Sequence, residues 1–169
     1  VRSLNSHYKW VTCPYLLERY QRDCGLAGVA FETVDLQSFT DLKEAEAATA
    51  GRGRLYLEDA HFEIIESDLA PLAKAIAPLI SHPSVKKRLS EDLVVVNNKD
   101  FKFFALYALA VNARNLLDEQ KTSQNLWYEE TIPPDTLFYT LLLARPGEEG
   151  ALNSLVELLK QYPYLQVGG

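Results

Sequence analysis

The chain has 169 residues, of which 47% are hydrophobic, so it can bury one core but is short for two domains. No apolar run approaches the roughly 20 residues that cross a bilayer, so we expect a soluble, cytoplasmic protein without a membrane partner. The net charge of −6 argues against a general polyanion binder. However, residues 31–70 hold ten acidic and three basic residues, so a nucleic-acid-binding surface stays open elsewhere in the chain.

The cysteines and histidines lack the spacing of a metal site. Cys13 and Cys24 form no CxxC motif, and we interpret both as reduced packing thiols. The three histidines show no HExxH or similar spacing. We therefore assign no metal ligand to this chain.

The first third of the chain predicts a strand, a helix and an acidic insertion. The segment "SHYKWVT" alternates like a strand, and the following helix would have Thr12 as its cap, Pro14 in its first turn and Gly25 as its stop. Residues 32–54 show little apolar periodicity, which predicts a mobile acidic insertion with one helical turn.

The middle of the chain alternates between strand and helix patterns. "RLYLEDAHFEII" predicts one strand, and apolar residues at helical spacing over 69–80 predict a helix capped by Asp68. "LVVV" at 93–96 is typical of a buried strand. Asp100 would cap a short helix whose aromatic cluster either packs in the core or stacks on bases; its members are Phe101, Phe103, Phe104 and Tyr107.

Residues 109–143 predict a hairpin region. A strand with one polar face, "LAVNARNLLD", leads through the polar loop 118–125 into "LWYEETIPPDTLFY". "TLFYTLLLA" is apolar on both faces and predicts a central, covered strand. A final helix begins at Glu148 and Glu149 and ends near Lys160, before a short strand "YLQV".

These elements predict a single α+β domain over residues 1–169. Interleaved strands and helices with hairpins favour an antiparallel sheet with helices mainly on one face and a β-hairpin extension. The ferredoxin-like arrangement is the architecture we expect.

The adjacent carboxylates Glu129 and Glu130 raise the question of a two-carboxylate site. In a regular strand Tyr128 and Glu130 lie on one face, while Trp127 and Glu129 lie on the other. The two glutamates then point apart, which weakens the hypothesis of a carboxylate hydrolase unless a β-bulge intervenes.

Two interpretations stay open for the Trp127 side of this strand. The indole could stack on an unpaired base while Glu129 accepts a hydrogen bond from a ribose hydroxyl. Alternatively, Trp127 packs in the core and the glutamates are solvated. Arg114, on the polar face of the preceding strand, either contacts a phosphate or forms an ion pair with one of the glutamates.

Four blocks of the sequence resemble a known family. They are "VRSLNSHYKWVTCPYLLERYQRD", "LVVVNNKDF", "ARNLLDEQKTSQNLWYEETIPPDTLFY" and "YLQVGG". In this order they are similar to the RAMP superfamily protein that forms the backbone of Cmr-type (type III-B) CRISPR effector complexes. The tryptophan-glutamate block is the most diagnostic one, and residues 32–54 contribute little.

The resemblance implies a modified ferredoxin-like, RRM-related RAMP fold that stacks along a guide RNA. The implied partners are guide (CRISPR) RNA, target RNA, other Cmr subunits and copies of the chain itself. The implied activity is endoribonuclease cleavage of bound target RNA with help from a divalent metal, Mg or Mn. A non-catalytic module for protein–protein assembly is the alternative.

The resemblance also implies roles for individual residues. Trp127, Tyr128 and Arg114 match positions at the RNA, Glu129 and Glu130 become auxiliary catalytic candidates, and Gly168 and Gly169 match the start of an RNA-contacting loop. The family's cleavage aspartate belongs to a segment before the first block and has no counterpart here. Because the sequence also contains no methionine, we expect a fragment that could be inactive in isolation.

Overall fold

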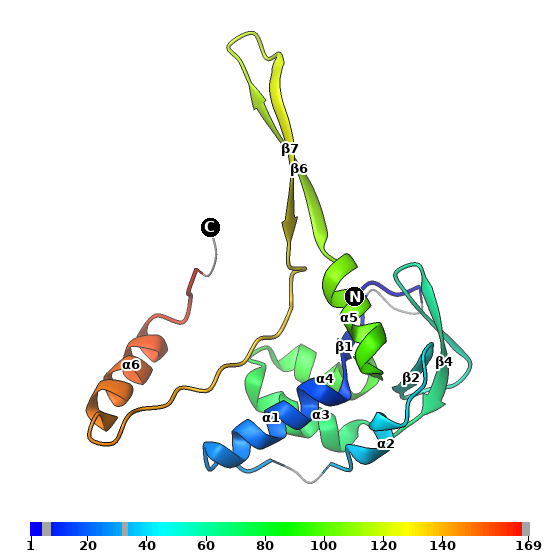
Figure 1. Ribbon diagram of the computed structural model, residues 1–169, viewed down its shortest axis with the longest axis vertical. Coiled ribbons are helices and arrows are strands. Elements are labelled where there is room, and N and C mark those ends of the chain that lie inside the picture. The colour runs from blue at the N-terminus through cyan, green and yellow to red at the C-terminus, as the bar shows by residue number, and fades with distance from the viewer. Residues whose placement is uncertain (5–7, 32–33, 167–169) are drawn as a thin grey trace. The chain divides into compact units, whose positions relative to one another are not determined.

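The structure is a computed structural model that describes residues 1–4, 8–31 and 34–166 (Figure 1). It divides the chain into two units, Val1–Leu137 and Phe138–Gly169, where the sequence predicts one domain. The first unit holds a five-stranded sheet and a separate two-stranded hairpin. Each unit is described by itself.

The five-stranded sheet has the order β1-β5-β2-β4-β3. Its strands are β1 (Trp10–Thr12), β2 (Glu46–Thr49), β3 (Arg54–Leu57), β4 (Ala60–Glu66) and β5 (Leu93–Val96). The pairs β1–β5 and β2–β4 are parallel, whereas β2–β5 and β3–β4 are antiparallel. The expected antiparallel sheet is therefore wrong and the sheet is mixed, because β1 and β5 are separated by a helix-containing connection long enough for parallel pairing.

Five α-helices and a short 3₁₀ helix accompany this sheet. They are α1 (Pro14–Leu26), α2 (Gln37–Thr40), α3 (Ala70–Ile76), η1 (Ala77–Leu79), α4 (Pro83–Asp92) and α5 (Asn98–Tyr107). One core cluster joins residues of α1 to α4 to one face of the sheet, and a second cluster joins Phe104 of α5 to the other face. The expected α+β class with helices mainly on one face is confirmed (Figure 1).

Strand β5 contributes residues to both core clusters. Leu93 and Val95 belong to the cluster on the helix-rich face, while Val94 and Val96 belong to the other cluster. All four side chains are at most 3% exposed. The continuous apolar run is therefore explained by burial on both faces, and the predicted strand is confirmed.

The acidic segment 32–54 contains a core strand, contrary to the sequence prediction. Its one helical turn is α2, but β2 then pairs with both β4 and β5. Ala47 and Ala48 are 0% and 1% exposed and face opposite clusters. Alanine has weak strand propensity, so neighbouring backbones and not the local sequence make this strand.

The segment predicted as one strand at 54–65 is two. It turns between β3 and β4, where Glu58 adopts a φ of 49°. The predicted alternation holds within β3, since Leu55 and Leu57 are buried and Tyr56 is exposed. Hydrophobic periodicity did not show the turn because "LEDA" lacks the Gly or Asn that usually marks it.

Helix α1 begins and ends differently from the prediction, although its position is right. Cys13 occupies the N-cap position in place of Thr12, and Gly25 lies inside the helix. Cys13 and Cys24 are free, 2% and 6% exposed, which confirms them as packing thiols. Burial raises the pKa of the Cys13 thiol, which keeps it protonated.

Asn97, and not Asp100, caps helix α5. The Asn97 side-chain oxygen accepts hydrogen bonds from the backbone N–H groups of Lys99 and Asp100, both at 2.9 Å. Asp100 instead accepts from the Ala45 N–H at 3.0 Å and so holds the loop before β2. In the aromatic cluster Phe104 is buried, whereas Phe103 and Tyr107 are exposed.

Loss of this cap should destabilise the first unit. We expect Asn97→Ala to lower the free energy of unfolding by about 1 kcal/mol, because two N–H groups at the helix start lose their acceptor. Lys102→Ala, at an exposed position of the same helix, is the control and should change it by less than about 0.5 kcal/mol. Urea denaturation of the three proteins measures the difference.

The predicted hairpin is present as β6 (Ala110–Leu117) and β7 (Ser123–Thr131). Its loop is shorter than predicted, because β7 begins at Ser123 and not at Leu126. The expected central strand "TLFYTLLLA" is wrong: the described chain has no strand over 136–144, and Leu143 is 74% exposed. The apolar pattern is typical of a strand buried on both faces, but no strand in the described part of the chain pairs with residues 136–144.

The second unit is built around α6 (Glu149–Gln161), which confirms the predicted final helix. Its leucines remain partly exposed, with Leu155 at 41% and Leu158 at 52%. Residues 164–166 form no strand, contrary to the prediction for "YLQV", and its last residue lies outside the described ranges. In the described chain, no helix has the length and apolarity that would be required to cross a membrane.

Candidate functional site

The β6–β7 hairpin carries the residues singled out from the sequence. Arg114 pairs with Trp127 and Asn112 with Glu129, so these four side chains share one face of the ribbon. We call it the Trp127 face, and it also includes Thr131. The opposite face, which we call the Tyr128 face, includes Val111, Ala113, Asn115, Leu126, Tyr128 and Glu130.

This register separates the two adjacent glutamates. Glu129 lies on the Trp127 face and Glu130 on the Tyr128 face, and the only irregularity in the pairing is at Leu116 and Leu117. The predicted alternation is confirmed, and no β-bulge near the glutamates brings them together. A hydrolase built on Glu129 and Glu130 as a carboxylate pair therefore has no support in the geometry.

Glu129 connects the two strands on the Trp127 face. Its Oε1 accepts a hydrogen bond from the Trp127 indole nitrogen at 3.1 Å, and its Oε2 accepts one from Arg114 Nε at 2.9 Å. These bonds and the Arg114 charge lower the pKa of Glu129. Of the two interpretations of Arg114, the structure therefore shows the ion pair with a glutamate.

The site is open to solvent. Trp127 is 41% exposed and Tyr128 is 67% exposed, so the indole is not packed in a core. The side chains of Arg114 and Glu129 are 59% and 42% exposed. The alternative in which Trp127 packs in the core is wrong on this point, because β6 and β7 lie outside both core clusters.

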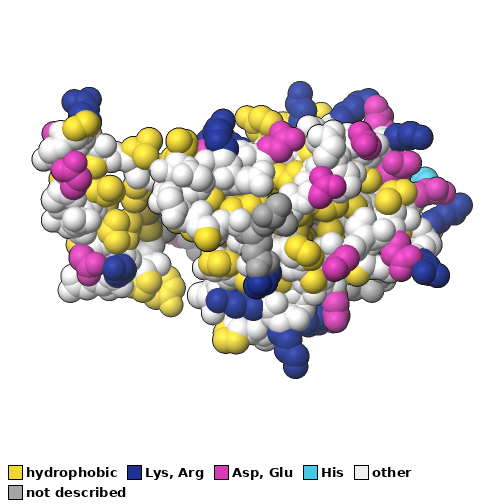
Figure 2. Space-filling view, turned by 90° about the horizontal axis from the view of Figure 1, so that it is seen from below, with side chains coloured by type: hydrophobic (Ala, Val, Ile, Leu, Met, Phe, Trp, Pro, Cys, Tyr) yellow, Lys and Arg dark blue, Asp and Glu magenta, His cyan; other side chains and the backbone are white. Residues whose placement is uncertain are grey.

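The Trp127 face combines an aromatic ring, a guanidinium group and hydrogen-bonding side chains. An exposed indole can stack on an unpaired base, and a guanidinium group can bind a phosphate. Beside them, Asn112 Nδ2 donates a hydrogen bond to Thr131 Oγ1 at 3.1 Å. Figure 2 shows acidic and basic side chains interspersed on the visible face of the first unit, so that face has no extended basic patch.

The described residues do not fit a divalent metal site. Within residues 1–4, 8–31 and 34–166, no group of three or more His, Cys, Asp or Glu side chains is arranged to hold a metal ion. Both oxygens of Glu129 are already hydrogen-bonded, and Glu130 lies on the other face. We derive no catalytic step through a metal.

The sequence predicted the positions of most of these residues and left the partner of Arg114 open between two alternatives. Alternation put Trp127 and Glu129 on one face, but the contact of Glu129 with Arg114 depends on the cross-strand register. The loop length that sets this register was predicted incorrectly. Gly168 and Gly169, the remaining expected RNA contacts, lie outside the described residues.

Known proteins similar to this chain were found by sequence and by structure. No family model matches the sequence. The CRISPR system Cmr endoribonuclease Cmr4 of Pyrococcus furiosus is 30% identical over 178 residues, which cover 100% of this chain and 60% of that protein. The crystal structure of oligomeric Cmr4 from P. furiosus superimposes with a TM-score of 0.70 at 26% identity, covering 100% of this chain and 63% of that chain.

Over its whole length, the chain is similar to Cmr4 of P. furiosus. A more distant match within type III-B assemblies is a chain in the apo-state structure of a Cmr-beta complex, with a TM-score of 0.56, 18% identity and coverage of 93% and 55%. These matches confirm the ferredoxin-like RAMP fold. The chain spans 60% of the length of its curated RAMP relative.

Proposed function

We propose that this chain is the RNA-binding part of a backbone subunit in a type III-B CRISPR effector complex. Its partners would be guide RNA, target RNA, other Cmr subunits and copies of itself in a cytoplasmic complex. The single observation that carries the proposal is the exposed indole of Trp127 directly opposite Arg114 on an exposed hairpin. The similarity to Cmr4 supports the same function.

The exposure of the hairpin supports a role in binding. A two-stranded ribbon is marginally stable in water unless something covers it. Both strands consist almost entirely of exposed residues, and Figure 1 shows the ribbon of β6 and β7 extended after α5. An RNA strand bound to the Trp127 face would shield that face of the hairpin from water.

Cleavage is the second part of the proposal. The curated relative is named as an endoribonuclease, and we propose that the complete subunit cleaves guide-paired target RNA with help from Mg or Mn. Glu129 and Glu130 remain auxiliary candidates, on opposite faces of the ribbon. The principal catalytic group is not assigned to a residue of this chain.

Replacing Trp127 or Arg114 should weaken RNA binding. We expect Trp127→Ala to lower the affinity of the full chain for single-stranded RNA by about 1–3 kcal/mol, because a stacking surface is lost. Arg114→Ala should weaken binding and reduce the dependence of log Kd on log salt by about 0.7, the contribution of one phosphate contact. Fluorescence anisotropy at several salt concentrations measures both effects.

Arg52→Ala is the matched control for Arg114→Ala. Arg52 is also an exposed arginine whose Nε pairs with a glutamate, Glu66, at 2.7 Å, but it lies outside the hairpin. Its replacement should leave RNA affinity unchanged. If Arg52→Ala and Arg114→Ala behave alike, the assignment of RNA to the Trp127 face is wrong.

Protein–protein assembly without RNA contact is the second candidate function. The Tyr128 face favours it, because Val111, Leu126 and Tyr128 are 60%, 55% and 67% exposed. RNA footprinting of an assembled complex separates the two functions. The RNA-binding function requires protection by this subunit, whereas a pure assembly module gives none.

A further inference from the structure

We infer that Glu129 is a positioning residue that holds the Trp127 indole and the Arg114 guanidinium side by side as one platform for a single unpaired nucleotide. The inference rests on the proposed RNA binding and deepens it, because it assigns Glu129 a role in recognition. It follows from three contacts on the Trp127 face.

Each carboxylate oxygen of Glu129 accepts a hydrogen bond from one of its two neighbours. Oε1 accepts from the indole nitrogen at 3.1 Å, and Oε2 accepts from Arg114 Nε at 2.9 Å. These two bonds use one lone pair of each oxygen and fix the orientation of the carboxylate between its two donors. Its pKa is also lowered, so it is a weak proton acceptor near neutral pH.

The register of the hairpin places the Arg114, Trp127 and Glu129 side chains beside one another. Arg114 pairs directly with Trp127, and Glu129 lies two residues beyond Trp127 on the same face of β7. The carboxylate therefore links neighbours along the strand and across it. An exposed indole and an exposed arginine have several rotamers each, and two hydrogen bonds to one carboxylate reduce that freedom before RNA arrives.

The contacts with Glu129 leave parts of the indole and of the guanidinium group available to a ligand. The indole is held through its N–H edge, which leaves a ring face for a base. The guanidinium is held through Nε, and no acceptor among the described residues engages its two amino nitrogens. Arginine can present those nitrogens to phosphate oxygens, so the platform suits a base together with its own phosphate.

The sign of the effect distinguishes positioning from simple electrostatics. RNA is a polyanion, so removal of a negative charge near it should strengthen binding. If Glu129 positions the platform, its removal should weaken binding in spite of the favourable change in charge. Electrostatics alone and positioning therefore predict opposite changes in RNA affinity when Glu129 is replaced by alanine.

The binding experiment uses the full chain and a fluorescently labelled single-stranded RNA of about 15 nucleotides. We expect Glu129→Ala to raise Kd by about threefold to tenfold, which matches the net contribution of about one ordinary hydrogen bond. Glu129→Gln, which keeps one acceptor oxygen, should lie between Glu129→Ala and the unmodified protein. Glu119→Gln, in the loop at 118–122, removes the same charge from the same hairpin and should leave Kd unchanged or lower it.

A double-mutant cycle tests the coupling to the indole. Trp127→Phe keeps an aromatic ring but removes the N–H donor to Glu129. In that background Glu129→Ala should have a smaller effect on Kd than in the unmodified chain, because one of the two linked groups is already released. Equal effects in both backgrounds would show that Glu129 does not act through Trp127.

A spectroscopic readout reports the contact without RNA. The chain has two tryptophans, so 5-fluorotryptophan labelling gives two ¹⁹F resonances, and Trp127→Phe assigns them. The Trp127 resonance should shift in Glu129→Ala but not in Glu119→Gln. Because the pKa of Glu129 is lowered, the contact should persist above the ordinary glutamate range and be lost only as the pH falls through the lowered pKa.

The outcomes separate this inference from the proposed function. If the unmodified chain and Glu119→Gln do not bind RNA, the proposed function fails and the inference fails with it. If both bind RNA and Glu129→Ala binds equally well or more tightly, only the positioning role is overturned. Weaker binding by Glu129→Ala, intermediate binding by Glu129→Gln and a shifted Trp127 resonance together establish it.

Discussion

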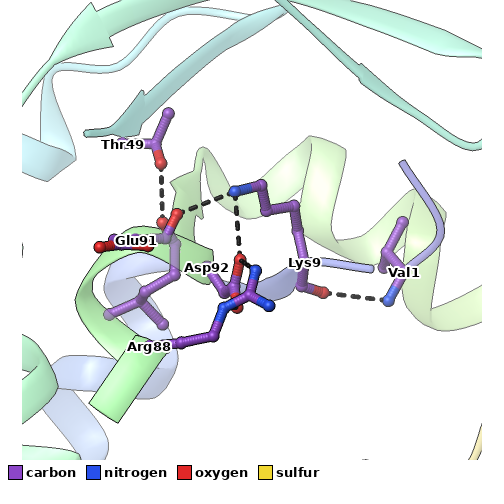
Figure 3. A network of polar contacts seen from close by, with 7 residues as sticks. Val1, Lys9, Thr49, Arg88, Glu91 and Asp92 are labelled. Atoms are coloured by element: carbon purple, nitrogen blue, oxygen red, sulfur yellow. Dashed lines mark hydrogen bonds and ion pairs between the residues drawn. The ribbon is translucent and has the colours of Figure 1, made fainter. Parts of the chain in front are cut away.

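Replacing Asp92 with alanine is expected to lower the free energy of unfolding of the first unit by about 3 kcal/mol. Asp92 is 8% exposed at the end of α4. Its Oδ1 lies 3.5 Å from Lys9 Nζ and its Oδ2 lies 3.3 Å from Arg88 Nε. Figure 3 shows Asp92 beside both cations. The Lys9 side chain is only 12% exposed, so the substitution leaves a cation with little access to water.

The position of this network explains the size of the effect. Lys9 precedes β1, and its Nζ also donates to the Glu91 carbonyl oxygen at 2.8 Å. The buried Thr49 hydroxyl donates to the Leu93 carbonyl oxygen at 2.8 Å, which fastens β2 to β5 beside the same helix end. Loss of Asp92 therefore affects the junction at which three strands meet α4.

The exposed pair of Arg52 and Glu66 is the matched control. Its atoms are closer, at 2.7 Å, but its side chains are 83% and 57% exposed. Solvent screens this pair, so Glu66→Ala should cost less than about 1 kcal/mol. Urea denaturation measures the free energy of unfolding of both variants. A larger loss in Glu66→Ala than in Asp92→Ala would contradict this explanation.

Leu72→Ala is expected to lower the free energy of unfolding by about 2–5 kcal/mol. Leu72 is 0% exposed on α3, within the cluster on the helix-rich face of the sheet. Removal of its side chain leaves a cavity between α3 and its neighbours, which a close-packed core fills only partly. The midpoint of urea unfolding measures the change, and an unaltered m-value would show that the native state remains intact.

Leu79→Ala provides the comparison at a surface position. Leu79 lies on η1, a few residues along the same polypeptide, and is 37% exposed. Since part of its side chain already contacts water, its truncation should cost roughly half as much or less. Equal losses from the two substitutions would mean that the cluster around Leu72 is not a tightly packed core.

Local patterns correctly predicted the elements whose conformation is indicated by their own residues. The apolar run of β5 and the leucine spacing of α6 are of this kind. Strand β2 is different, because Ala47 and Ala48 are suited to the space between the two core clusters and carry little strand signal of their own. Its position depends on pairing with β4 and β5, which lie outside any short stretch of sequence around β2.

The same limit applies to the candidate site. Period-two alternation correctly placed Trp127 and Glu129 together and Glu130 apart, because it depends only on a regular strand. The partner of Glu129 could be named only as one of two alternatives for Arg114. The choice required the pairing of β6 with β7, which depends on the five-residue loop at 118–122.

The position of β5 between β1 and β2 also has a consequence for how the protein is made. During synthesis the β3–β4 hairpin can pair as soon as it emerges, and β2 can join β4 soon afterwards. Strand β1 must wait until residues 93–95, its partners in β5, have left the ribosome. We therefore expect the sheet to assemble from two separate parts, with the insertion of β5 between them as the slow step that completes it.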